Sequence, residues 1–187
     1  MRIFNLKQHV TIEPELRLRA REFAQKVVDT VDYRDSNQRI REKIRLDHFI
    51  SKIGEEAVRK VFEMYGCEVK GPDYRIYDGN AKSWEDDLFI DDVGLAVKTQ
   101  SRSSAEKYGL SWTFQDSESR KDNIFNRPKA WVCFVECNDV GKSYNSIVYP
   151  SFQVGELIFK PPKLAHLQGK KRVVYAEDLP WKEKSEK

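Results

Sequence analysis

The clearest pattern of apolar and polar residues in this chain is a pair of short apolar runs around an acidic turn. The runs are Leu-Phe-Ile at 88–90 and Leu-Ala-Val at 95–97. The residues between them, 91–94, are Asp-Asp-Val-Gly, and we interpret Asp91 and Asp92 as turn residues. This pattern predicts a β-hairpin whose aliphatic side chains face a core.

Alternation along the two strands sets the direction of three polar side chains. When the aliphatic residues face the core, Asp87, Lys98 and Gln100 all point to the opposite face. A four-residue loop, or a two-residue loop centred within it, pairs Ile90 with Leu95 and places Asp87 directly opposite Lys98. A carboxylate opposite a lysine is either an ordinary cross-strand ion pair or part of a reactive site, and the hairpin alone allows both.

Two segments before the hairpin have helical periodicity. From Pro14, apolar residues recur at three- and four-residue spacing, and proline suits the first turn of a helix. A second helical segment runs from about residue 37 to residue 65. Gly54 either bends this segment or separates two helices, and Gly66 is the expected C-cap.

Two adjacent glutamates follow Gly54 on the second segment. Glu55 lies at the edge of the apolar stripe, whereas Glu56 is expected to project toward solvent with Lys60. Later in the chain, residues 130–137 form the strongest strand pattern, apolar enough to be covered on both faces. Together these segments predict an α/β fold.

Composition limits the classes of protein that remain. The chain has 187 residues, 40% of them hydrophobic, which favours one domain with a real core over disorder. Its 33 basic and 30 acidic residues give a net charge of only +3, so net charge does not identify a nucleic-acid partner. No run approaches the roughly 18 apolar residues of a membrane helix, and no secretory pattern occurs, so we expect a cytoplasmic protein without a membrane partner. The three cysteines lack the paired spacing of a zinc site.

The order of the predicted elements is also the order found in a known family. A helix with Glu55 and a strand near Val69 precede the hairpin with Asp87 and Lys98, and a central strand follows. Over roughly residues 53–135 the chain resembles the PD-(D/E)XK, or restriction-endonuclease-like, nuclease superfamily, whose motifs are short and degenerate. In that family the first core helix carries an acid, an aspartate begins the second strand, and the third strand carries an acid-x-lysine triplet.

The resemblance implies a fold and an activity. The fold would be a restriction-endonuclease-like core, a mixed β-sheet flanked by α-helices, with a helical N-terminal elaboration. In one domain, residues 1–47 would form an N-terminal arm and basic helices, 48–180 the core, and 181–187 a frayed tail. The activity would be that of a Mg²⁺-dependent DNA endonuclease, with Mn²⁺ as a substitute, of the restriction or homing type in a prokaryotic or phage setting. An enzyme of this kind that cuts both strands of DNA is expected to act as a homodimer.

The resemblance also assigns roles to individual residues. Asp87 would be the anchoring metal ligand, and Glu55 and the Val97 carbonyl would complete the coordination, since Mg²⁺ prefers oxygen ligands. Lys98 would orient the attacking water or stabilise charge that develops on the phosphate. Gln100, one strand repeat beyond Lys98 on the same face, is a further catalytic candidate.

One departure from the family pattern leaves other functions open. Ala96 occupies the acidic position of the triplet and cannot bind a metal. Gln100 or a shifted Glu55 would compensate for the missing acid. Glu56 is the second choice for the acid of the helix. Asp86 is expected to point toward the core. Without compensation, the chain would be a non-catalytic nucleic-acid-binding or assembly protein that retains a nuclease fold. A third alternative is an α+β interaction protein whose cross-strand contact is only a surface ion pair.

Candidate nucleic-acid contacts come from the basic helical region and from the polar segments after the hairpin. Such residues either form a solvated face or contact phosphates, and none can be assigned to base recognition from sequence. The candidates are Arg39, Arg41, Lys43, Ser101, Arg102, Ser103, Lys107, Arg120 and Lys121.

Overall fold

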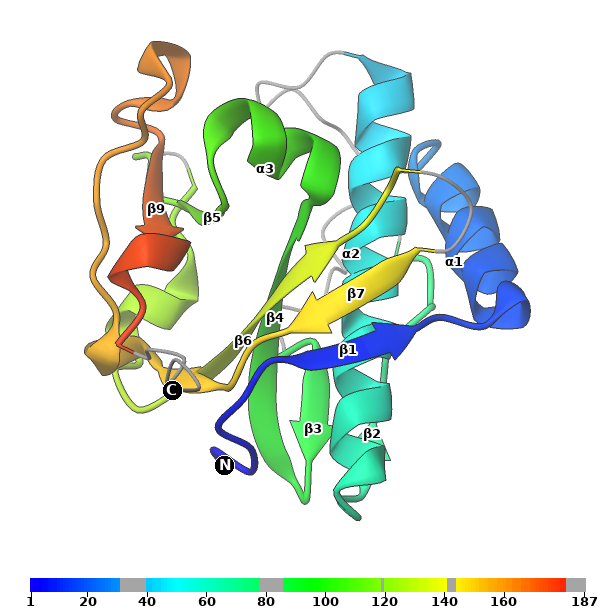
Figure 1. The fold of residues 1–187 in the computed structure, drawn as a ribbon. Coiled ribbons are helices and arrows are strands. Elements are labelled where there is room, and N and C mark those ends of the chain that lie inside the picture. The colour runs from blue at the N-terminus through cyan, green and yellow to red at the C-terminus, as the bar shows by residue number, and fades with distance from the viewer. Residues whose placement is uncertain (31–39, 78–85, 119, 141–143, 181–187) are drawn as a thin grey trace.

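The computed structural model describes the chain in five segments, residues 1–30, 40–77, 86–118, 120–140 and 144–180. Within them the protein has a mixed α/β fold. A long helix covers one face of a mixed sheet, and a smaller two-stranded sheet covers the other face (Figure 1). The predicted α/β class is therefore confirmed, whereas the predicted frayed tail at 181–187 lies outside the described residues.

The main sheet has seven strands within the described residues. Only β4 and β6 run parallel, and the other neighbouring strands are antiparallel. The predicted central strand is confirmed as β6, and its side chains enter a core on each face. The order across the sheet is β1 (Gln8–Thr11), β7 (Asn145–Val148), β6 (Trp131–Cys137), β4 (Val93–Ser101), β3 (Leu88–Ile90) and β2 (Val69–Lys70), and β8 (Phe152–Gln153) also pairs with β6.

The remaining elements are helices and a second, two-stranded sheet. This sheet pairs β5 (Ser111–Gln115) with β9 (Lys171–Tyr175) in antiparallel fashion. The α-helices are α1 (Pro14–Val27), α2 (Arg41–Met64) and α3 (Arg102–Tyr108). Short 3₁₀ helices are η3 (Asn123–Asn126), η4 (Val154–Glu156), η5 (Ala165–Leu167) and η6 (Ala176–Asp178). Among the described helices, none combines the length and the apolar character needed to cross a bilayer.

Gly54 has a packing role in the middle of α2. The helix continues through this residue, so Gly54 does not separate two helices. A Cβ atom at position 54 would lie only 1.8 Å from Thr99 Oγ1 on β4, so glycine allows the helix to lie directly on the strand. Gly66 follows the end of α2 with a φ of 81°, which confirms the predicted C-cap.

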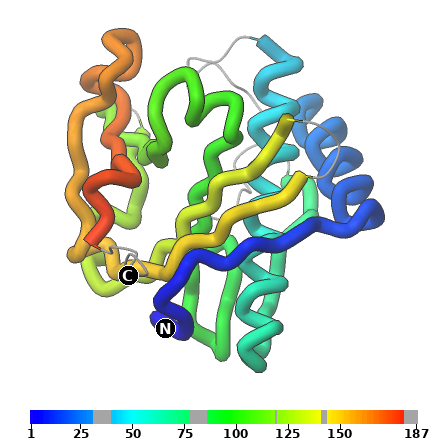
Figure 2. Tube along the Cα trace, in the orientation of Figure 1, coloured from blue at the N-terminus to red at the C-terminus, as the bar shows by residue number. Residues whose placement is uncertain are grey.

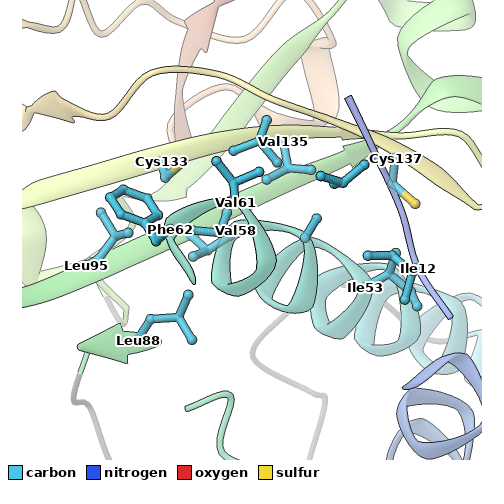
Figure 3. Close-up of a cluster of buried hydrophobic side chains, with 14 of the residues drawn as sticks. Ile12, Ile53, Val58, Val61, Phe62, Leu88, Leu95, Cys133, Val135 and Cys137 are labelled. Atoms are coloured by element: carbon cyan, nitrogen blue, oxygen red, sulfur yellow. The ribbon is translucent and has the colours of Figure 1, made fainter. Parts of the chain in front are cut away.

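The two faces of the main sheet pack against different layers. Figure 2 shows the chain passing from α1 and α2 on one side of the sheet to the β5–β9 region on the other. The helix-side core, shown in Figure 3, joins α2 to β3, β4 and β6 through largely aliphatic side chains: Ile53, Val58, Val61, Phe62, Leu88, Leu95, Cys133 and Val135. The opposite core is largely aromatic and includes Ala96, Trp112, Phe114, Phe134, Tyr149 and Phe152. Burial of each large apolar side chain contributes about 1.5–3 kcal/mol.

The hairpin forms as predicted, but its register differs by two residues. Ile90 pairs with Val93 and Leu88 with Leu95, so the predicted pairing of Ile90 with Leu95 was wrong. The loop is the two-residue turn Asp91–Asp92, with φ values of 45° and 63°. Positive φ at both central residues is the geometry of a type I′ turn, which matches the twist of the flanking strands and selects this tighter register.

The register shift changes the partner of Asp87 but preserves its alternation. Continuing the observed pairing places Asp87 opposite Ala96 instead of Lys98. Because the shift is even, Asp87 still falls on the same face of the hairpin as Ala96 and Lys98, as predicted. That face is not open, since Ala96 is buried in the aromatic core and Lys98 Nζ lies 5.0 Å from the centre of the Phe114 ring.

Candidate active site

Asp87 lies where the pairing between β3 and β4 ends. In the described residues, the pairing between β3 and β4 includes only residues 93–95 of β4. Beyond that point the Asp87 carboxylate accepts a hydrogen bond of 2.7 Å from the backbone N–H of Val97. The N–H and C=O of one residue in an extended strand point to the same edge, so the Val97 carbonyl faces the same side as Asp87.

Glu55 approaches this edge from α2. Its side chain is buried, and it accepts hydrogen bonds of 2.6 Å from Lys52 Nζ and 3.3 Å from Ser51 Oγ. The pKa of Glu55 is raised to about 8, mainly by burial and then by the Asp87 carboxylate, while Lys52 and Ser51 oppose this shift. The two carboxyl groups are therefore close enough to repel each other when both are charged.

Lys98 reaches the same edge from the aromatic face. Its ammonium group donates a 3.0 Å hydrogen bond to Asp122, whose other oxygen accepts from the backbone N–H of Ile124 and caps η3. Burial raises the pKa of Asp87, while the Val97 N–H and the charge of Lys98 lower it. Asp87 thus interacts electrostatically with both Glu55 and Lys98, one from each side of the sheet.

A cleft of about 300 Å³ opens beside these groups. Glu55, Asp87, Asp86 and Lys52 line it on the side of α2 and the sheet, and the segment from Lys70 to Tyr77 forms the opposite wall. The described lining residues do not include Lys98, which lies behind the edge on the aromatic face. The cleft therefore presents charges of both signs: the carboxylates of Glu55, Asp73, Asp86 and Asp87, and the basic groups of Lys52, Lys70 and Arg75.

Asp86 does not point into the aliphatic core as the alternation predicted. Its carboxylate accepts two hydrogen bonds, of 3.1 and 3.0 Å, from the guanidinium group of Arg127. It also lies over Gly94, where an added Cβ would be 2.0 Å from Asp86 Oδ2. Asp86 precedes the first residue of β3, so strand alternation does not fix its direction.

Glu56 is buried, which contradicts the prediction that it projects toward solvent. It is only 1% exposed and accepts hydrogen bonds of 2.7 Å from Arg59 Nε and 2.9 Å from the Tyr74 hydroxyl. The segment containing Tyr74 packs over this side of α2, and a helical periodicity cannot reveal that covering layer. Glu55, in contrast, lines the cleft and is the glutamate of the candidate site.

Gln100 lies on the predicted face but binds the start of β5. Its Oε1 accepts a 2.8 Å hydrogen bond from the Ser111 N–H, and its Nε2 donates a 3.3 Å bond to the Gly109 carbonyl. Both ends of the amide are therefore used in fixing the turn between α3 and β5. This geometry gives Gln100 a positioning role for β5.

The predicted nucleic-acid contacts fall in separate places. On α3, Ser101 caps the helix, Ser103 binds Asp139, and Arg102 pairs with Glu136 at 2.8 Å. The other described candidates are Arg41, which pairs with Asp29; the exposed Lys43; Lys107, beside the Tyr108 ring; Arg120, whose backbone hydrogen-bonds to that of Ser117; and Lys121, whose Nζ is 3.7 Å from Asp116. Arg39 lies outside the described residues.

One basic group connects α2 to β9: Lys43, Arg120 and Lys98 were predicted from the sequence, but Lys171, which joins them, was not. Burial lowers the pKa of Lys171, and the positive charges of Arg120, Lys43 and Lys98 lower it further, while Asp47 opposes them. These side chains come from α2, from residue 120 between β5 and η3, and from β4 and β9. They place positive charge beside Lys98, although no local sequence motif joins them.

Lys52 and Asp122 are the other site residues that sequence reasoning missed. Lys52 stands three residues before Glu55, a spacing that predicts contact on a helix, so its pairing was available from the sequence. Asp122 lies 24 positions after Lys98, and only the tertiary fold joins the two.

The oxygen donors at the edge of β4 fit a hard divalent cation whose remaining ligands come from the substrate. Mg²⁺ commonly takes one or two carboxylates and completes its shell with water and phosphate oxygens. Glu55, Asp87 and the Val97 carbonyl supply oxygen donors of that kind. No cluster of three or more His, Cys, Asp or Glu side chains suited to a metal occurs in the part of the chain that the structure describes. A metal here would therefore depend on ligands from outside the protein.

Comparison with known proteins adds no relative: no family model, curated protein or solved structure matches this chain.

Proposed function

We propose that this chain is a Mg²⁺-dependent DNA endonuclease of the PD-(D/E)XK type, acting at specific sites in restriction or homing. The observation that carries the proposal is the position of Asp87. Its carboxylate is held at the free edge of β4 by the Val97 N–H, between Glu55 on one side of the sheet and Lys98 on the other. Mn²⁺ is the expected substitute for Mg²⁺.

The order of the elements supports the same proposal. α2 carries Glu55, the antiparallel strands β2, β3 and β4 follow, and α3, β5 and η3 lie between β4 and β6, which runs parallel to β4. This order agrees with the resemblance, in which a helix with an acid precedes the hairpin and a central strand follows, with Asp87 before the second strand and Lys98 on the third. The resemblance and the geometry therefore select the same residues.

Each side chain has a distinct task in phosphodiester hydrolysis. Asp87 and Glu55 would hold the cation, and the Val97 carbonyl faces the same edge of the strand. The chemistry that bound Mg²⁺ supplies is neutralisation of phosphate charge and a lower pKa for the attacking water. Lys98, held by Asp122, orients that water or stabilises the negative charge that develops on the phosphate.

DNA is the expected substrate because positive charge gathers beside the site. Lys171 interacts electrostatically with Lys43, Arg120 and Lys98. Lysine and arginine side chains at such positions bind phosphates without reading sequence. A homodimer would present two such sites, one to each strand of a duplex.

A second candidate function is favoured by two observations. Ala96 occupies the acidic triplet position and is buried in the aromatic core, and Lys52 already pairs with Glu55. Both features suit a non-catalytic nucleic-acid-binding or assembly protein that retains the fold with a disabled site. Such a protein would bind DNA and leave it uncut with every metal.

The deciding experiment is incubation of the purified protein with plasmid and with branched, flapped and single-stranded DNAs in Mg²⁺ or Mn²⁺, followed by mapping of the ends. Cleavage that EDTA abolishes and that Asp87→Asn removes supports the endonuclease. Binding of DNA without cleavage under all these conditions supports the non-catalytic alternative.

A further inference from the structure

Lys52 occupies the candidate site in a way that the proposed mechanism does not use. Its ammonium group is 2.6 Å from Glu55 Oε2, and its side chain is only 12% exposed. It lines the same cleft as Asp87 and Asp86. A lysine is rarely buried to this extent unless its charge is matched, and here the matching charges are the carboxylates assigned to the metal.

Aromatic rings hold the Lys52 ammonium group in place. The Phe23 ring of α1 lies 5.0 Å from Nζ, and the Tyr74 ring lies 5.5 Å from it, both within the range of a cation–π contact. Three separate parts of the chain therefore converge on this amine: α1, α2 and the 70–77 segment. A simple surface ion pair, whose partners are free to separate, has no such enclosure.

We propose that Lys52 is the built-in counter-cation of the site, which balances Glu55 and Asp87 and competes with the divalent ion for them. This inference rests on the proposed function, because it concerns the metal affinity of the same carboxylates. It assigns Lys52 as a positioning residue that keeps metal binding weak until the ammonium group is displaced. Lys52 lowers the pKa values of both carboxyl groups, which agrees with an ammonium group near both.

The test is calorimetric titration with MnCl₂ and MgCl₂ at fixed pH and ionic strength. Replacement of Lys52 by Met should tighten Mn²⁺ binding by at least about tenfold, because the ion no longer displaces a bound cation. Lys52→Arg keeps the charge and should retain the affinity of the wild-type protein. In a Glu55→Gln background, the gain from Lys52→Met should disappear.

Two further variants keep the result interpretable. Lys60→Met removes another lysine–glutamate pair of α2, with Glu13, outside the cleft, and should leave Mn²⁺ affinity unchanged. Lys52→Gln keeps a polar donor for Glu55 and replaces Lys52→Met if circular dichroism shows that the latter is unfolded. It should also bind Mn²⁺ more tightly than the wild-type protein.

The outcomes separate this inference from the proposed function. If the wild-type protein binds Mn²⁺ and the folded Lys52 variants bind it equally or more weakly, the role of Lys52 is overturned and the metal site stands. If neither the wild-type protein nor the folded variants bind either metal, both proposals fail. Binding that appears or tightens only when Lys52 is neutralised supports the counter-cation.

Discussion

The two faces of the main sheet differ both in their cores and in the charged groups that they bring to the candidate site. The helix layer packs largely aliphatic side chains and supplies the carboxylate of Glu55 and the ammonium group of Lys52. The β5–β9 layer packs aromatic side chains, such as Trp112 and Phe134 with ring centres 4.5 Å apart, and Lys98 lies on its side. Asp87 stands at the strand edge between the two layers.

This difference shows why the site forms at an edge. Within either layer, a lone charge would be buried among apolar groups, at a cost of several kcal/mol. At the edge of β4, the two layers end and the strand presents backbone groups that need partners. Charged side chains of both signs can meet at this edge without being buried completely among apolar groups.

The largest effect should come from the residue between the layers. Asp87→Asn keeps an oxygen that accepts from the Val97 N–H but removes the charge, so cleavage should fall by at least about 1000-fold while the fold remains. Rates on mapped DNA substrates and circular dichroism measure the two effects. Asp92→Asn in the exposed turn is the matched control, and equal rates for both variants would remove Asp87 from the mechanism.

Lys98 tests the contribution of the aromatic side. Lys98→Met preserves the contact with the Phe114 ring and removes the ammonium group, so we expect a loss of about 100-fold in the rate of cleavage. DNA affinity, measured in Ca²⁺ to prevent cutting, should change much less. A variant with weak binding but a normal single-turnover rate would instead make Lys98 a phosphate contact.

Gly54 tests how closely the helix layer must approach the sheet. Gly54→Ala places a methyl group against Thr99, so the free energy of unfolding should fall by about 1–3 kcal/mol. Urea denaturation measures this change. The double variant Gly54→Ala, Thr99→Ser should recover part of the loss, because one of the crowded methyl groups is then absent. Unchanged stability in the single variant would mean that α2 does not lie on β4 at this distance.

The two glutamates of α2 should separate function from stability. Glu55→Gln should slow cleavage by about tenfold or more, because it removes a negative oxygen donor from the cleft. Glu56→Gln should instead destabilise the fold by about 1–3 kcal/mol, since Arg59 and Tyr74 lose a charged acceptor. The reverse order, with Glu56→Gln the less active of the two, would contradict the assignment of Glu55.

The smallest effect should come from the basic group beside Lys98. Lys171→Gln should weaken DNA binding a few-fold and reduce the slope of log K against log salt by about one. Fluorescence anisotropy across a salt series measures both. Lys160→Gln, which removes a lysine that pairs with Asp178, is the control, and an equal change in both variants would mean that DNA does not contact this group specifically.

Several parts of the fold and the site followed from local sequence. The hairpin, the start of α1 at Pro14, the C-cap at Gly66 and the doubly buried β6 each depend on a few neighbouring residues, and each prediction was confirmed. The pattern also placed Ala96 and Lys98 on one face of β4. The register failed by two residues because the type I′ turn, with positive φ at both aspartates, was not foreseen.

The sequence by itself determined which residues alternate and which repeat along a helix, because those patterns follow from the fixed geometry of strands and helices. Only the tertiary structure decided which faces are covered. It buried Glu56 beneath Tyr74, joined Lys98 to Asp122, and packed the Phe23 and Tyr74 rings against Lys52. These contacts join segments distant in the chain or depend on a covering layer, and local periodicity carries no information about either.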